Sequence, residues 1–167
     1  MEFVVTKNRV LGIDPGSRVM GWGIIEEVSG VVKLVDCGTV RATDTDFARR
    51  MGVIFKRLDA IIAEHAPTVA AVENVFTAKN AASALKLGQA RGVALAACAS
   101  HDMDVFSYEP TKIKQTIVGG GRAAKEQVAF MVAQILGVKK PNWALDTSDA
   151  LAAAICHLNT SRYAKFL

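Results

Sequence analysis

The sequence predicts an α/β fold in which a mixed β-sheet of five strands is flanked by α-helices. Three observations support this prediction. The first quarter of the chain holds three strand-like segments, and the remainder alternates short apolar strands with helical segments. No internal repeat or linker divides the 167 residues, and hydrophobic residues make up 51% of them. We therefore expect one domain that spans residues 1–167 and buries a sizeable core.

The first three expected strands form an antiparallel meander. Each is rich in apolar or β-branched residues, and turn-forming sequences separate them at Pro15-Gly16-Ser17 and at Ser29-Gly30. Gly21 and Gly23, inside the second segment, indicate a bulge or the close approach of another backbone. The expected strands cover residues 9–14, 20–28 and 31–41.

Helices and short strands alternate over the rest of the chain. Asp44 or Thr45 is expected to cap the first helix, in which apolar residues recur at helical spacing up to about His65 before Pro67 ends the pattern. Two further strands are expected at residues 68–73 and 104–108, and helices at residues 81–100, 110–117, 123–136 and 146–158.

Four acidic residues stand where these elements would present them. Asp14 and Glu73 each end an apolar strand, while Asp146 and Asp149 lie three residues apart at the start of the last helix, on one helix face. Mg²⁺ prefers oxygen ligands such as carboxylates. Two such ions about 4 Å apart can act on the attacking and leaving oxygens of a phosphodiester. Each acid also has an ordinary explanation as a turn, capping or solvated residue, so the pattern alone indicates only a metal-dependent nuclease class.

The positive charge of the chain is concentrated in its centre. The formal net charge is +4, and the segment from Lys79 to Lys125 contains seven basic and three acidic residues, which accounts for the whole excess. A basic segment of this kind suits a phosphate-rich partner, and a solvated surface is the alternative.

Several other classes of protein are not expected. Cys37, Cys98 and Cys156 are odd in number and far apart, which favours buried reduced thiols over disulfides or zinc. No apolar stretch is long enough to cross a bilayer, and the N-terminus lacks a secretory pattern, so a cytoplasmic protein without a membrane partner is expected. No G-x-x-x-x-G-K-[ST] sequence is present for ATP hydrolysis.

Five segments resemble, in order, the motifs of the RuvC family of crossover junction endodeoxyribonucleases. The resemblance extends from about Val10 to about His157, and the segment from Lys79 to Gly92 is its most specific part. The matching sequences are LGIDPGSR at residues 11–18, VENVF at 72–76, AKNAASALKLGQARG at 78–92, KIKQTIVG at 112–119 and DTSDALA at 146–152.

The resemblance implies an RNase H-like fold and a Holliday junction resolvase. The expected activity is paired, symmetric nicking of four-way DNA junctions by a homodimer during homologous recombination and DNA repair, leaving 5′-phosphate and 3′-hydroxyl ends. Cooperation with the RuvA–RuvB branch-migration complex is implied as well. The catalytic and metal-binding positions of the family fall on Asp14, Glu73, Asp146 and Asp149, with two Mg²⁺ or Mn²⁺ ions per active site.

The resemblance also implies DNA contacts outside the acidic positions. Phe76 matches an aromatic residue that stacks on an unpaired base, although a core phenylalanine is the alternative. Lys114 and Lys125 match basic residues near the scissile phosphate. Non-specific DNA affinity is expected from Lys79, Lys86 and Arg91.

Two features depart from the usual family pattern. Residues 1–8 extend beyond the usual family start and are candidates for a flexible N-terminal extension. Position 149 is a histidine in some relatives, so the role of Asp149 is the most open to substitution.

Overall fold

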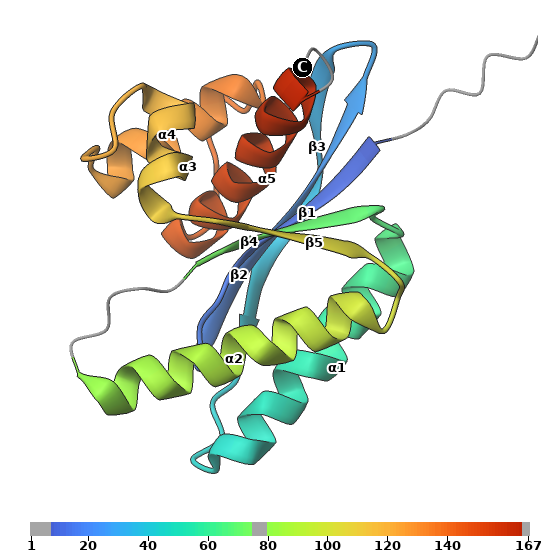
Figure 1. Ribbon diagram of the computed structural model, residues 1–167, viewed down its shortest axis with the longest axis vertical. Coiled ribbons are helices and arrows are strands. Elements are labelled where there is room, and N and C mark those ends of the chain that lie inside the picture. The colour runs from blue at the N-terminus through green and yellow to red at the C-terminus, as the bar shows by residue number, and fades with distance from the viewer. Residues whose placement is uncertain (1–7, 75–79, 165–167) are drawn as a thin grey trace, which may run out of the picture.

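A mixed five-stranded β-sheet forms the centre of the computed structural model, which describes residues 8–74 and 80–164 (Figure 1). The strands lie in the order β3-β2-β1-β4-β5. β1, β2 and β3 form the expected antiparallel meander, whereas β4 and β5 run parallel to β1. Their bounds are Asn8–Asp14 for β1, Val19–Val28 for β2, Val31–Arg41 for β3, Val69–Glu73 for β4 and Asp104–Tyr108 for β5. The predicted fold class is confirmed.

Helices cover both faces of this sheet. Figure 1 shows one group of helices below the sheet and a second group above it. The lower pair is α1 (Phe47–His65) and α2 (Ala81–Ala99), which share one buried apolar cluster with the sheet. The upper group is α3 (Pro110–Val118), α4 (Lys125–Ile135) and α5 (Leu145–Ala164), which share a second cluster.

The alternation of side chains along β1 assigns its residues to these two clusters. Leu11 and Ile13 point towards α1 and α2, while Val10 points towards α5, and all three are fully buried. Side chains alternate between faces in a strand, so Gly12 and Asp14 lie on the same face as Val10. The apolar run that precedes Asp14 therefore reflects a strand buried on both faces.

Glycines in β1 and β2 let α5 lie directly on the sheet. A Cβ atom built on Gly12 would lie 1.9 Å from the carbonyl oxygen of Ala150, and one on Gly21 would lie 2.0 Å from that of Asp146. Gly12 is paired with Gly23, and a Cβ atom built on Gly23 would lie 2.3 Å from the Leu151 side chain. The close approach anticipated at Gly21 and Gly23 is thus confirmed, and α5 is the element that approaches.

The ends of several elements differ from those predicted. The cap of α1 is Asp46, whose side chain accepts the backbone N–H of Arg49 at 2.8 Å, rather than Asp44 or Thr45. Asp44 instead accepts the N–H of Asp46, which shapes the turn before the helix. α5 continues six residues beyond the predicted end at residue 158, to Ala164.

Other expectations concern the N-terminus, the cysteines and the membrane. β1 begins at Asn8, and the rest of the proposed N-terminal extension lies outside the described residues. All three cysteines are free thiols; Cys98 and Cys156 are buried as expected, but Cys37 on the edge strand β3 is only half-buried. In the described part of the chain, every helix is too short or too polar to cross a membrane.

We expect Gly12→Ala to destabilise the protein strongly. The added methyl group would overlap the α5 backbone at Ala150, which cannot rotate away as a side chain could. Overpacking of this kind costs about 1–3 kcal/mol or more. Gly52→Ala is the matched control, because Gly52 lies in α1 with nothing near its Cβ position, and alanine there should add up to about 1 kcal/mol. Urea denaturation measures both, and equal effects in the two variants would contradict the packing argument.

Candidate active site

Two of the predicted acidic residues end neighbouring parallel strands. Asp14 is the last residue of β1, and Glu73 is the last residue of β4. The register pairs Ile13 with Val72, so the acids follow at adjacent positions. Adjacent strands lie about 4.8 Å apart, and the two carboxylates therefore meet at one edge of the sheet.

The first turns of α5 bring the other two acids to the same edge. The helix begins over Gly21, which faces the backbone of Asp146, and crosses Gly12, which faces the backbone of Ala150. Gly21 is the partner of Asp14 in the β1–β2 ladder. Asp146 and Asp149 consequently lie close enough to Asp14 for their negative charges to act on it.

The crowding of negative charge changes the proton affinity of the two strand-end acids. Burial, followed by the charges of Glu73 and Asp149, raises the pKa of Asp14 to about 9. Burial also raises the pKa of Glu73, while its hydrogen bond with Asp14 and the charges of Lys125 and Lys114 act in the opposite direction. At neutral pH one proton is therefore held on Asp14 and shared with Glu73.

Two lysines complete this cluster from the neighbouring helices. Lys125, the first residue of α4, donates a hydrogen bond to Asp149 with an Nζ–Oδ2 distance of 2.8 Å. This bond raises the pKa of Lys125, which stays charged. Lys114 extends from α3 into a cavity of about 340 Å³, which Lys125 also lines. The residues that line the cavity are Glu73, Pro110, Ile113, Lys114, Lys125, Val128 and Asp149.

The donor atoms of the acidic cluster fit a hard divalent cation. Asp14, Glu73, Asp146 and Asp149 offer only carboxylate oxygens, and a cation would replace the proton that burial and the neighbouring charges retain on Asp14. Among the described residues, no three Asp, Glu, His or Cys side chains surround a single point closely enough to hold a metal by themselves. This arrangement suits Mg²⁺, which takes one or two protein carboxylates and completes its shell with water and substrate phosphate oxygens.

The remaining predicted DNA contacts lie elsewhere or outside the described residues. Phe76 and Lys79 belong to residues 75–79, which the structure does not describe. Lys86 and Arg91 lie on α2, which covers the opposite face of the sheet from the acidic cluster. Arg91 donates a hydrogen bond to the Ser107 hydroxyl on β5, so it contributes to packing at the sheet edge.

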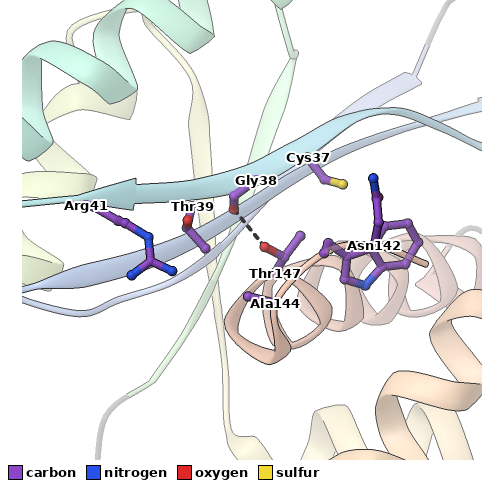
Figure 2. Close-up of a pocket in the computed structure, with 8 residues that line it drawn as sticks. Cys37, Gly38, Thr39, Arg41, Asn142, Ala144 and Thr147 are labelled. Atoms are coloured by element: carbon purple, nitrogen blue, oxygen red, sulfur yellow. Dashed lines mark hydrogen bonds between the residues drawn. The ribbon is translucent and has the colours of Figure 1, made fainter.

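A second cavity, of about 420 Å³, lies between β3 and the start of α5 (Figure 2). Thr39 and Arg41 extend into it from β3, and Asn142 lines it from the segment before α5. The Thr147 hydroxyl on α5 donates a hydrogen bond to the Gly38 carbonyl on β3 at 2.9 Å and so links the two walls of the cavity. Sequence reasoning missed this cavity, because Thr39 and Arg41 look like ordinary alternating strand residues until α5 is placed beside them.

Comparisons with known proteins agree on one family. The family model described as crossover junction endodeoxyribonuclease RuvC matches residues 10–157. A protein of that name from Oleidesulfovibrio alaskensis is 67% identical over 153 residues, which cover 92% of each chain. One from Nitratidesulfovibrio vulgaris strain Hildenborough is 58% identical over 153 residues, again with 92% of each chain covered.

Solved structures of similar proteins share the fold. A structure of Thermus thermophilus RuvC in complex with Holliday junction substrate matches with a TM-score of 0.86 and 34% identity, covering 93% of this chain and 96% of that chain. A second Thermus thermophilus RuvC structure matches with a TM-score of 0.83 and 33% identity over the same shares. The predicted RNase H-like fold is confirmed by these neighbours.

We expect the metal-free protein to lose stability as the pH rises from about 4 towards about 9. Over this interval the native state keeps the Asp14 proton, because the pKa is raised to about 9, whereas the unfolded chain loses it near 3.8. The native state then binds more protons than the unfolded state, so the free energy of unfolding falls with pH. Asparagine at position 14 does not titrate, so the free energy of unfolding of Asp14→Asn should fall less steeply with pH.

Urea denaturation in EDTA at about pH 4 and about pH 8 measures the effect. The two proteins should differ little at the lower pH, and Asp14→Asn should be more stable at the higher pH by at least about 1.4 kcal/mol, which corresponds to one pKa unit. Identical pH dependence in the two proteins would show that Asp14 does not carry the retained proton.

Proposed function

The chain belongs to the RuvC family of crossover junction endodeoxyribonucleases, and we infer that it is a metal-dependent nuclease that cleaves DNA phosphodiesters at Holliday junctions. The observation that carries this inference is the meeting of strand-end acids, helix acids and two lysines at one edge of the sheet. Acids without lysines would repel the DNA backbone, and lysines without acids would only bind it. Their combination supports binding and hydrolysis at the same place.

We propose that Asp14, Glu73, Asp146 and Asp149 hold the divalent cations, two Mg²⁺ or Mn²⁺ ions per site. When bound, the ions would supply an activated water and stabilise the leaving 3′ oxygen. Asp14 would be the central ligand of this set, because the charges of the other three carboxylates all act on it. It would give up its proton as the ions bind, and the products would carry 5′-phosphate and 3′-hydroxyl ends.

Lys114 and Lys125 are proposed to bind the phosphate that is cut. Both side chains line the cavity that also contains Glu73 and Asp149. Lys125 forms an ion pair with Asp149. If Asp149 held a cation, the Lys125 ammonium would be free to bind a phosphate oxygen. The ion pair thus holds both charged groups at the place where cation and phosphate would bind.

Paired symmetric nicks require two active sites related by a two-fold axis, and we propose a homodimer for this reason. The first half of α2 supports it. Residues 81–86 of this helix are all exposed, and the Leu85 side chain is 65% exposed. Figure 1 shows this end of α2 extending away from the sheet. An apolar helix surface of this kind suits a second copy of the chain.

Three further proposals rest on the family rather than on described contacts. Phe76, three residues after Glu73 in the sequence, would stack on an unpaired base near the crossover. The protein would act in the cytoplasm, in homologous recombination and DNA repair. It would work beside the RuvA–RuvB branch-migration complex.

Asp14→Asn should keep junction binding and abolish cleavage. Cation-assisted hydrolysis is worth several kcal/mol, so the loss in rate should be at least about a hundredfold. A synthetic four-way junction with Mg²⁺ or EDTA, beside a linear duplex of the same sequence, measures cleavage, and gel shift in Ca²⁺ measures binding. Wild-type protein that cuts the duplex as fast as the junction, or cuts in EDTA, would overturn the proposed function.

Leu85→Glu should weaken the dimer. Burying a leucine at an interface contributes about 1.5–3 kcal/mol, so the dissociation constant should rise at least about tenfold. Val53→Glu is the matched control, since Val53 is 39% exposed on α1 and carries the same change of charge. Sedimentation velocity over a range of concentrations distinguishes the two variants. Equal dissociation constants for both would place the interface elsewhere.

A further inference from the structure

One row of the sheet connects the acidic cluster to the cavity between β3 and α5. The register pairs Asp14 with Gly21 and Gly21 with Thr39, so the three residues lie side by side across β1, β2 and β3. Cross-strand partners present their side chains on the same face. Thr39 therefore faces the same side as Asp14, two strand spacings or about 10 Å away.

Gly21 lies between these two residues in the sheet. It has no side chain, and the start of α5 rests on it at the backbone of Asp146. Arg41 follows Thr39 by two residues and thus points to the same face of β3. Thr39 and Arg41 therefore line the cavity from the face of the sheet that also carries Asp14, and the start of α5 lies between the two positions.

The cavity presents hydrogen-bond donors that have no partner among residues 8–74 and 80–164. Among the described residues, the side chains of Thr39, Arg41 and Asn142 make no hydrogen bond, and Arg41 forms no ion pair. Thr147 differs from them, because its hydroxyl is used to hold α5 against Gly38. Figure 2 shows Arg41 and Thr39 reaching from the strand towards the side on which Thr147 and Ala144 lie.

These donors match a phosphate group in kind. A guanidinium presents a planar fork of N–H groups that fits two phosphate oxygens, and it is always charged. A hydroxyl and an amide can add neutral hydrogen bonds. The other wall is the start of α5, a 20-residue helix whose positive end also favours an anion. Since no acidic side chain lines this cavity, nothing within it opposes a negative charge.

We propose that this cavity binds a second backbone phosphate of the DNA strand that is cut, through Arg41, Thr39 and Asn142. The inference rests on the proposed function and adds a subsite to it. A separation of about 10 Å places this phosphate within a few nucleotides of the one that is cut. Arg41 is a binding residue that fixes the direction of the strand across the acidic cluster and takes no part in the chemistry.

The test combines one protein variant with single neutral linkages in the junction. Junctions would carry one methylphosphonate in the cut strand, placed in turn at each of several linkages on either side of the scissile phosphate. For wild-type protein, one linkage within a few nucleotides should lower the single-turnover rate at subsaturating protein by about tenfold, the effect of one charged hydrogen bond. In Arg41→Gln, the unmodified junction should already be about tenfold slower, and the same methylphosphonate should have no further effect.

Arg57→Gln is the matched control. Arg57 is an exposed arginine on α1, on the opposite face of the sheet, and loses the same charge. This variant should keep the wild-type rate and its sensitivity to the neutral linkage. Arg41→Gln should also reduce the slope of log binding constant against log salt by about 0.7–0.9, as expected for one lost phosphate contact. Asn142→Ala supplies a second, smaller change in the same cavity without altering charge.

The outcomes separate this inference from the proposed function. A methylphosphonate penalty that stays undiminished in Arg41→Gln would overturn the subsite, as would equal rates for Arg41→Gln and Arg57→Gln. A scan in which no linkage other than the scissile one matters would also overturn it. In each of these cases wild-type protein still cuts the unmodified junction. Failure of the proposed function is a different result, in which wild-type protein does not cut that junction at all.

Discussion

The direct contact between α5 and the β1–β2 ladder is the constraint on which the site depends. Gly12 and Gly21 leave no room for a side chain, and the α5 backbone occupies that space. Helices usually pack on a sheet through side chains on both partners, which holds their backbones well apart. Here the glycines remove one layer, and two helix carboxylates reach the strand-end acid Asp14. A larger residue at either glycine would lift the helix and separate the acids, even if every acid were kept.

The placement of the acids that suits the proposed function also destabilises the folded protein. Three carboxylates act on the half-buried Asp14, and this repulsion together with burial raises the free energy of the native state until a proton or a cation is present. The fold tolerates this because both faces of the sheet are covered by apolar clusters that do not involve the acids. Lys125 offsets part of the repulsion through its ion pair with Asp149. Active sites commonly contain such locally unfavourable arrangements, supported by the structure around them.

Much of the fold could be predicted from the sequence, because local patterns specify it. The strands of the sheet were predicted from the apolar runs that end in Asp14 and Glu73 and from the turn sequences between strands. Gly21 and Gly23 indicated the close approach of another backbone. The meeting of Asp146 with Asp14 could not be predicted from spacing, since it depends on where α5 lies. Sequence spacing also could not show that Arg91, which is expected to add DNA affinity, hydrogen-bonds Ser107, because that contact depends on where α2 packs. The cap of α1 was placed too early, since three neighbouring polar residues could serve and only backbone geometry selects Asp46.

The row from Thr39 through Gly21 to Asp14 indicates how one sheet can serve two tasks. A β-strand ladder fixes the spacing of its residues more rigidly than a loop can, since backbone hydrogen bonds join β1 to β2 and β2 to β3. Groups placed on one row therefore keep a constant separation while a substrate is bound. A DNA strand has a repeating charge along its length, and recognition at two fixed points defines its direction as well as its position. The same α5 that delivers two acids also forms one wall of the Arg41 cavity, so any movement of this helix would disturb both points together.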